Sequence, residues 1–308
     1  MSKNFGILLK TYNGDVKYVK RLLVSFHKHN IENIPLYLVC PEVEIDIFRQ
    51  FNDKNIFLFS DESITEELVC DDSILGIRPG YINQEIIKLA FWEKKLCDNY
   101  FCLDSDIVFI RDFYIHDFMF NENIPYTILQ EDNELIVDPE YYNTHWIGRA
   151  EYIQKINKAI GYEDHRMLTC HGSAILSAKV LESFKLNYLN KNNFSYKDAL
   201  RIAPYEYSWY NIWLLKHKII EIEIREPIIK MFHQKSHHTE YINKGVTLDD
   251  IKRAYIGYNI NSNYSRSYGL VNYEDDKYEM TFFEIKKVIF EIFKSFFRKI
   301  LRNLNKIK

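Results

Sequence analysis

Short apolar runs alternate with amphipathic stretches over the first 110 residues of the chain. The apolar runs at residues 5–9, 36–40 and 56–60 predict three strands, and the amphipathic stretch at residues 16–28 predicts a helix between the first two. This alternation is typical of βαβ units, in which helices cover a largely parallel sheet. The pattern therefore predicts an α/β fold.

A helix and a strand lead into an acidic cluster, and less regular elements follow it. Residues 83–96 predict the helix, and residues 100–103 predict a strand that stops at the cluster. Further strands are predicted at 126–129, 173–177, 219–224 and 228–232, and further helices at 146–159, 178–189 and 206–216. After residue 233 the turn signals that delimit such elements are missing.

The composition is that of a globular protein with enough apolar material for a large core. Of the 308 residues, 47% are hydrophobic and 27% are charged, whereas glycine and proline number only 10 and 7. These values exclude collagen-like and disordered chains. No stretch reaches the roughly 20 apolar residues of a membrane-spanning helix, and the apolar run near the N-terminus is too short for a signal peptide.

The five cysteines are widely spaced and include no Cys-x-x-Cys pair, so they predict neither a zinc site nor a redox motif. Three of them lie in apolar runs, as reduced buried thiols often do. We therefore expect a protein of the reducing cytoplasm.

The C-terminal tail, residues 285–308, differs in charge from the rest of the chain. It contains eight Lys or Arg and one Glu, so its charge is +7 and that of the remaining residues is −10. This distribution argues against nucleic acid as a partner. Apolar residues recur in the tail at three- and four-residue steps opposite a basic face, which suits the anionic inner face of the cytoplasmic membrane. The alternative is a helix docked on its own domain or on the second subunit of a homodimer.

Two aspartates follow the strand predicted at residues 100–103 and precede another apolar run. Asp104, Ser105 and Asp106 would lie at the carboxyl edge of the sheet, where open α/β sheets bind ligands. Two carboxylates there can hold Mg²⁺ or Mn²⁺, which shares its coordination sphere with substrate phosphates and water. Such an ion stabilises the charge on a departing diphosphate, as in sugar transfer from a nucleotide sugar. The structural alternative is an acidic loop that closes a strand.

In its hydrophobic context this Asp-x-Asp motif resembles that of GT-A type glycosyltransferases, and the similarity spans residues 4 to about 235. More narrowly, the chain resembles a bacterial family of uncharacterised glycosyltransferase-like domains. Three further features carry that resemblance: Lys10-Thr11-Tyr12 with Asp15, Gln84-x-x-x-Lys88, and Glu206-Tyr207 before Tyr210.

The resemblance implies a GT-A, Rossmann-like fold with a mixed, mostly parallel sheet flanked by helices and a C-terminal helical extension. Since no linker divides the chain, we expect a catalytic domain over residues 1–250, a connecting region over 251–284 and a basic amphipathic helix over 285–308. The implied cofactor is Mn²⁺ or Mg²⁺, and the implied donor is a nucleotide diphosphate sugar, with UDP-sugars favoured.

Residues after the first strand and on the helix before the motif receive binding roles from the resemblance. In GT-A folds the turn after the first strand holds the base and ribose, so we assign Thr11, Tyr12 and Asp15 to the nucleotide. Tyr12 would stack on the base, and Asp15 would bind the ribose or simply cap the next helix. Gln84 and Lys88 share a helix face, from which Lys88 can reach a diphosphate and Gln84 can bond sugar or ribose hydroxyls. A solvated helix face is the alternative.

Glu206 is the predicted catalytic base of an inverting transfer, because a carboxylate beside an acceptor hydroxyl can remove its proton. The alternative is a first-turn acid that the helix dipole favours. The neighbouring Tyr207 is predicted to contact substrate, together with other aromatics that suit a sugar ring. Those aromatics are Tyr205, Trp209 and Tyr210.

Histidines supply the last candidates. His171 and Gly172 lie at a small-residue turn where GT-A enzymes often contact the donor sugar or acceptor, although His171 satisfied by backbone groups is an equal alternative. His233 matches the placement of the third metal ligand in retaining, glycogenin-like enzymes, but the glycine-containing motif of that family is absent. We expect His237 and His238 at the surface and slightly favour inversion.

The predicted function is a metal-dependent glycosyltransferase that adds a sugar to a bacterial surface glycan of the capsule, lipopolysaccharide or lipooligosaccharide. The acceptor would be a glycan or a lipid-linked glycan. One alternative is a sugar-nucleotide nucleotidyltransferase, for which the turn at residues 10–15 is a poor phosphate loop. The other is a non-catalytic carbohydrate-binding protein of the same fold.

Overall fold

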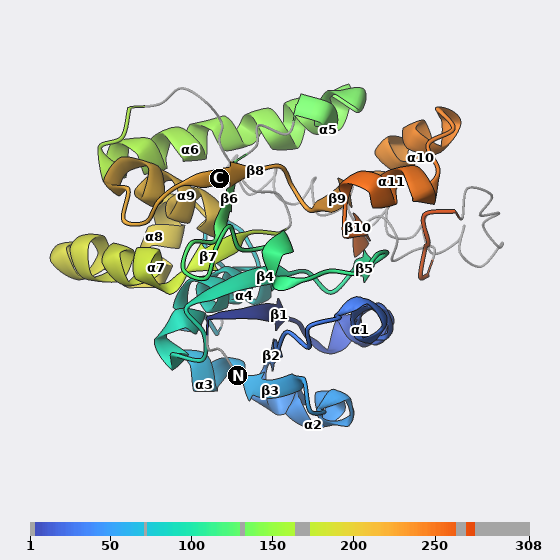
Figure 1. The fold of residues 1–308 in the computed structure, drawn as a ribbon. Coiled ribbons are helices and arrows are strands. Elements are labelled where there is room, and N and C mark those ends of the chain that lie inside the picture. The colour runs from blue at the N-terminus through green and yellow to red at the C-terminus, as the bar shows by residue number, and fades with distance from the viewer. Residues whose placement is uncertain (1–3, 71–72, 130–132, 164–172, 263–268, 275–308) are drawn as a thin grey trace, which may run out of the picture.

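The fold in Figure 1 is that of a computed structural model, which describes residues 4–70, 73–129, 133–163, 173–262 and 269–274. The predicted basic helix at residues 285–308, and the predicted substrate residues His171 and Gly172, lie outside the described residues.

Five strands form the central sheet in the order β3-β2-β1-β4-β7. The strands are β1 (Phe5–Lys10), β2 (Leu36–Cys40), β3 (Ile56–Ser60), β4 (Asn99–Leu103) and β7 (Ile175–Ser177). The pairs β1–β2, β2–β3 and β1–β4 are parallel, and β7 is antiparallel to β4. The prediction of a mixed, mostly parallel sheet is therefore confirmed.

Helices flank this sheet and bury their apolar faces against it (Figure 1). In α1 (Val16–His29) the buried residues Val19, Leu22 and Phe26 recur at three- and four-residue steps, and each such side chain contributes about 1.5–3 kcal/mol through burial. Pro79 begins α4 (Pro79–Ala90), because proline suits the first turn of a helix. The other helices around this core are α2 (Ile45–Phe48), α3 (Asp61–Ile64), α5 (Pro139–Tyr141), α6 (Ile147–Ile160), α7 (Ala178–Phe184), α8 (Tyr196–Ile202) and α9 (Glu206–His217).

A second sheet lies beside the first and has the order β5-β10-β9 (Figure 1). Its strands are β5 (Ile107–Phe109), β9 (Ile229–Phe232) and β10 (Gly257–Ile260), and β10 runs antiparallel to β5 and parallel to β9. At Gly257 a β-carbon would lie 2.8 Å from the carbonyl oxygen of Val108, so the close pairing of β10 with β5 requires glycine.

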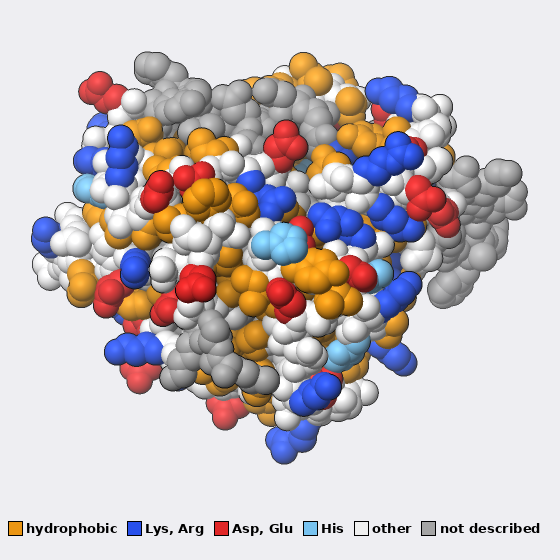
Figure 2. All heavy atoms as spheres, viewed as in Figure 1, with side chains coloured by type: hydrophobic (Ala, Val, Ile, Leu, Met, Phe, Trp, Pro, Cys, Tyr) orange, Lys and Arg blue, Asp and Glu red, His pale blue; other side chains and the backbone are white. Residues whose placement is uncertain are grey.

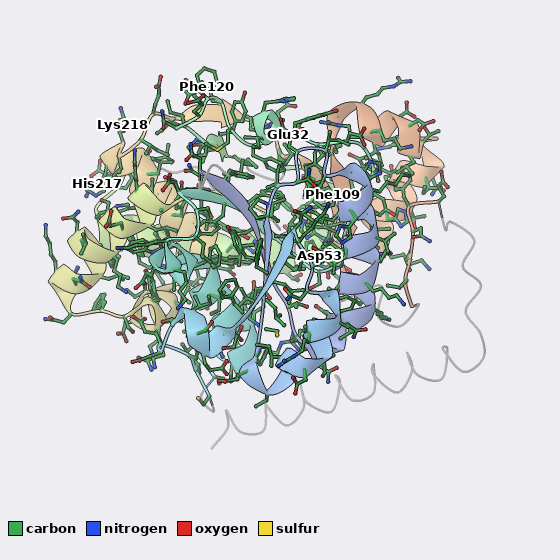
Figure 3. The ribbon with its side chains drawn as sticks, turned by 60° about the horizontal axis from the view of Figure 1, so that its bottom comes forward. Glu32, Asp53, Phe109, Phe120, His217 and Lys218 are labelled. Carbon is green, nitrogen blue, oxygen red and sulfur yellow. The ribbon has the colours of Figure 1, made fainter. Side chains whose placement is uncertain are left out.

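Helices α10 (Lys235–Asn243) and α11 (Leu248–Ala254) accompany the second sheet. They bury a separate apolar cluster with Phe232 and Tyr258. On the other side, Phe109 of β5, labelled in Figure 3, packs against α1 through Phe26, with ring centroids 6.2 Å apart. The second sheet is thus anchored to the core just beyond the aspartate motif.

One predicted strand is wrong. Residues 219–224 were expected to form a strand, but the structure has only β8 (Glu223–Arg225), which pairs with β6 (Tyr126–Ile128). Ile219, Ile220 and Ile222 instead pack against the core while partly buried, because β6 is only three residues long and offers them no pairing partner. In the part of the chain that the structure describes, no helix is both long and apolar enough to cross a membrane.

Candidate active site

A cavity of about 470 Å³ opens at the carboxyl ends of the parallel strands. Residues that follow four strands line it: Thr11 and Tyr12 after β1, Pro41 after β2, Asp61 after β3 and Asp104 after β4. This edge is where open α/β sheets bind ligands. On the face that Figure 2 shows, basic and acidic side chains are interspersed rather than gathered into a stripe of one sign.

Asp104 is held by the helix that precedes its strand. The Nε2 atom of Gln84 donates a hydrogen bond to Oδ1 of Asp104 over 3.0 Å, and Nζ of Lys88 lies 3.4 Å from the same oxygen. The other oxygen, Oδ2, has no partner among the described residues, and the side chain is 26% exposed. One carboxylate oxygen at the end of β4 therefore remains available to a ligand.

Asp106 is held by residues far along the chain. The side-chain amide of Asn259 donates to Oδ1 of Asp106, and the backbone N–H of Ser262 donates to Oδ2 over 2.7 Å. Burial, together with the charge of Asp104, raises the pKa of Asp106 to about 7. Both partners follow residue 250, at which the predicted catalytic domain ends, so the connecting region contributes to this site.

Lys88 joins two carboxylates inside the protein. Its Nζ lies 3.1 Å from Oε1 of Glu206 as well as 3.4 Å from Asp104, and it stands 4.8 Å from the centre of the Tyr207 ring. Burial opposes the charged ammonium, but Asp104, Tyr207 and Glu206 outweigh that effect and raise the pKa of Lys88 well above its ordinary value. A buried positive charge is thus fixed between Asp104 and Glu206.

The ends of β1, β3 and β4 are tied together by polar contacts. Ser105 donates to the hydroxyl of Thr11 over 3.1 Å, and Lys10 forms an ion pair with Asp61 over 3.0 Å. Burial raises the pKa of Asp61 to about 6, although the Lys10 ammonium opposes the shift. Asp15 precedes α1 but makes no side-chain capping hydrogen bond, so the capping alternative is not observed.

The cavity brings together the predicted nucleotide, metal and base residues that the structure describes, with Tyr207, but it does not include Trp209 or Tyr210. Their roles stay predictions, but their grouping is a property of the fold. The grouped residues are Thr11, Tyr12, Asp15, Gln84, Lys88, Asp104, Ser105, Asp106, Glu206, Tyr207 and His233.

Several aromatic and histidine predictions need correction. Trp209 and Tyr210 are core residues rather than sugar-stacking ones, and the Tyr210 hydroxyl accepts a hydrogen bond from the backbone N–H of Ser177 over 2.9 Å. His237 and His238 were expected at the surface but are buried, because α10 turns them toward the ring of Phe232.

The candidate metal ligands differ in how free they are to bind an ion. Burial, with nearby positive charge, lowers the pKa of His233 to about 3, so its ring is neutral. Within the described ranges, no three His, Cys, Asp or Glu side chains form a group that could hold a metal ion. Asp104 and Asp106 nevertheless offer hard oxygen donors, one with an uncommitted oxygen, and Mg²⁺ or Mn²⁺ completes its sphere with water and phosphate. Whether an ion binds between the two aspartates stays a prediction.

Some cavity residues were not predicted from the sequence. Tyr81 and Glu85 share with Lys88 the helical spacing that identified Gln84, so the periodicity of α4 contained that signal. Two further cavity residues could not be found from local sequence patterns, because the strand that precedes them was not predicted. These others are Asn261 and Ser262, which follow β10.

Comparisons with known proteins give three findings. A family described as a family of unknown function (DUF6492) matches residues 6–253. No curated protein matches the chain. Among solved structures, the apo crystal structure of mouse xyloside xylosyltransferase 1 is similar, with a TM-score of 0.44 and 11% sequence identity over 84% of this chain and 98% of that chain.

Proposed function

This chain belongs to the DUF6492 family, whose function is unknown, and we propose that it is a metal-dependent glycosyltransferase of the GT-A type. It transfers a sugar from a nucleotide diphosphate sugar, with UDP-sugars favoured, to a bacterial surface glycan of the capsule, lipopolysaccharide or lipooligosaccharide. The observation that carries the proposal is the convergence of Asp104, Asp106 and the buried Lys88 in one cavity at the carboxyl edge of the parallel strands.

The cavity suggests how the donor lies. Tyr12 and Asp15 adjoin the end of β1 and are assigned to the base and ribose, with Thr11 beside them. The diphosphate then reaches Lys88, whose positive charge suits phosphate oxygens. Asp104 and Asp106 would hold Mn²⁺ or Mg²⁺, which supplies further positive charge for the diphosphate.

Glu206 is the base in this proposal. The acceptor hydroxyl oxygen forms a bond to the anomeric carbon while the bond between that carbon and the diphosphate oxygen breaks. The proton of the hydroxyl passes to Glu206, and the nucleoside diphosphate departs with the electron pair. Lys88, 3.1 Å from Glu206, balances negative charge on both sides of the reacting carbon. Because attack and departure occur on opposite faces, the configuration inverts.

A thermal-shift screen of UDP-, GDP-, CMP- and dTDP-sugars with Mn²⁺ tests the proposal. A donor present at 100 times its Kd stabilises the folded state by about 2.7 kcal/mol, so one of the diphosphate classes (UDP, GDP or dTDP) should raise Tm by several degrees. The CMP-sugars, which carry a single phosphate, should not. The same ligands should fail to stabilise a folded Asp104→Ala/Asp106→Ala variant. Equal stabilisation of parent and variant, or stabilisation by no nucleotide sugar, contradicts the proposal.

We further propose that the protein is cytoplasmic and lies at the inner face of the cytoplasmic membrane through residues 285–308. The support is the +7 charge and the apolar periodicity of that segment. Flotation with anionic liposomes should be strong for the full chain and weak for a chain that ends at Met280. Equal flotation would favour the alternative, in which this segment docks on its own domain or on a second subunit.

A further inference from the structure

Arg149 and Tyr205 form one wall of the cavity, away from the residues assigned to the nucleoside. Arg149 lies in the first turn of α6, Tyr205 directly precedes α9, and these two helices pack against each other. The hydroxyl of Tyr210 accepts a hydrogen bond from Ser177, so α9 lies against β7. The nucleoside residues follow β1, and β1 and β7 lie on opposite sides of β4. The wall therefore belongs to the half of the cavity that the nucleoside leaves open.

Aromatic contacts hold the arginine and the tyrosine in place. The guanidinium carbon of Arg149 lies 4.9 Å from the centre of the Tyr205 ring, which is a cation–π distance. The ring of Tyr152 meets the same ring edge-on, with centroids 5.7 Å apart. Arg149 also hydrogen-bonds the side chain of Tyr205, but a guanidinium has five N–H donors. Both Arg149 and Tyr205 line the cavity and are partly exposed, so a ligand in the cavity can reach them.

The wall adjoins the place where the proposed reaction occurs. Tyr205 and Glu206 are consecutive, with α-carbons about 3.8 Å apart, and both line the cavity. A saccharide held with one hydroxyl at Glu206 therefore has neighbouring parts of its ring beside Tyr205 and Arg149. The carboxylate of Glu206 has its own counter-ion, because Nζ of Lys88 lies 3.1 Å from it.

We propose that Arg149 and Tyr205 form a subsite for an anionic group, a carboxylate or a phosphate, on the saccharide that reaches Glu206. Arg149 binds two oxygens of the anionic group through its planar fork of donors, and Tyr205 contacts the sugar ring. The proposal rests on the proposed function, which places the acceptor hydroxyl at Glu206. The anionic group belongs either to the acceptor or to the donor sugar, since both meet at this residue.

Calorimetric titration in the presence of Mn²⁺ tests the inference with ligands that differ in one group. For the acceptor, UDP is also present, and methyl glucoside is compared with methyl glucuronide and with glucose 6-phosphate. For the donor, UDP-glucose is compared with UDP-glucuronic acid. If the thermal-shift screen identifies another nucleotide, it replaces UDP in both arms. We expect the anionic ligand to bind at least tenfold more tightly in one arm, which identifies the molecule that carries the anion.

Variants of the arginine separate this role from a structural one. Arg149→Met should weaken binding of the anionic ligand about tenfold, while binding of the neutral ligand and of the nucleotide stays within twofold. Arg149→Lys keeps the charge but loses the fork, so it should weaken anionic binding about threefold. Arg201→Met is the matched control, because Arg201 pairs with Asp198 on the surface of α8, and it should change no affinity.

Two results would overturn the inference. One is the absence of a preference for the anionic ligand in both arms. The other is an equal loss of anionic, neutral and nucleotide binding in Arg149→Met, which would show a structural role. In either case normal nucleotide binding by the parent leaves the proposed function standing. If the parent binds no nucleotide diphosphate with Mn²⁺, the proposed function itself fails and the inference fails with it.

Discussion

Lys88 is the residue on which the electrostatics of the cavity depend most. Its Nζ lies 3.4 Å from Asp104 and 3.1 Å from Glu206, and it is buried. Replacing it with methionine keeps much of the volume but leaves two neighbouring carboxylates without their shared cation. Removing one partner of a buried ion pair costs about 3–5 kcal/mol. Because Asp104 is partly exposed, we expect the lower end, about 3 kcal/mol, for Lys88→Met.

Urea denaturation followed by circular dichroism measures this loss, with an unchanged slope showing that the same surface unfolds. Lys244→Met is a matched control, because Lys244 pairs with Glu240 at 3.0 Å on the surface and should cost well under 1 kcal/mol. The pKa of Lys88 is raised above its ordinary 10.5, so its charge stabilises the fold fully below pH 10.5 and is lost only as the pH rises through the higher folded value. The deficit should therefore be equal at pH 7 and pH 9. A deficit no larger than that of Lys244→Met would refute the reasoning.

Three further outcomes follow from the same contacts. Glu206→Gln should lower turnover at least a hundredfold while nucleotide affinity, measured by calorimetry, stays near that of the parent; unaltered turnover rules out a base at this position. Asn259→Leu removes a hydrogen-bond donor from Asp106, so it should weaken Mn²⁺ binding and lower the unfolding free energy by about 1–3 kcal/mol. Electron paramagnetic resonance measures the Mn²⁺ affinity, and an unchanged affinity would show that Asn259 does not position Asp106. The pKa of His233 is lowered to about 3, so below about pH 6.5 the folded state binds fewer protons than the unfolded one, and stability falls as the pH drops toward 3. His233→Phe should flatten that part of the plot of stability against pH. An unchanged slope contradicts the lowered pKa of His233.

Local patterns were sufficient for the central sheet and for part of the site. The strands β2 and β3 have the predicted bounds, because the apolar run of β2 lies between two prolines and that of β3 lies between Asn55 and the polar pair Ser60-Asp61. The position of Asp104 after β4, and the shared helix face of Gln84 and Lys88, followed from periodicity alone. These features depend on residues within a few positions of each other, which the sequence displays directly.

Contacts between distant segments were not readable in this way. The hydrogen bonds from Asn259 and Ser262 to Asp106 span more than 150 positions. Lys88 and Glu206 become neighbours only once α4 and α9 face the same cavity. The sequence by itself determined the sheet and the chemical character of its carboxyl edge, because burial pattern and strand ends are local properties. The tertiary structure alone decided which charges meet there, because the energy of a charge depends on neighbours that the chain brings close only by folding.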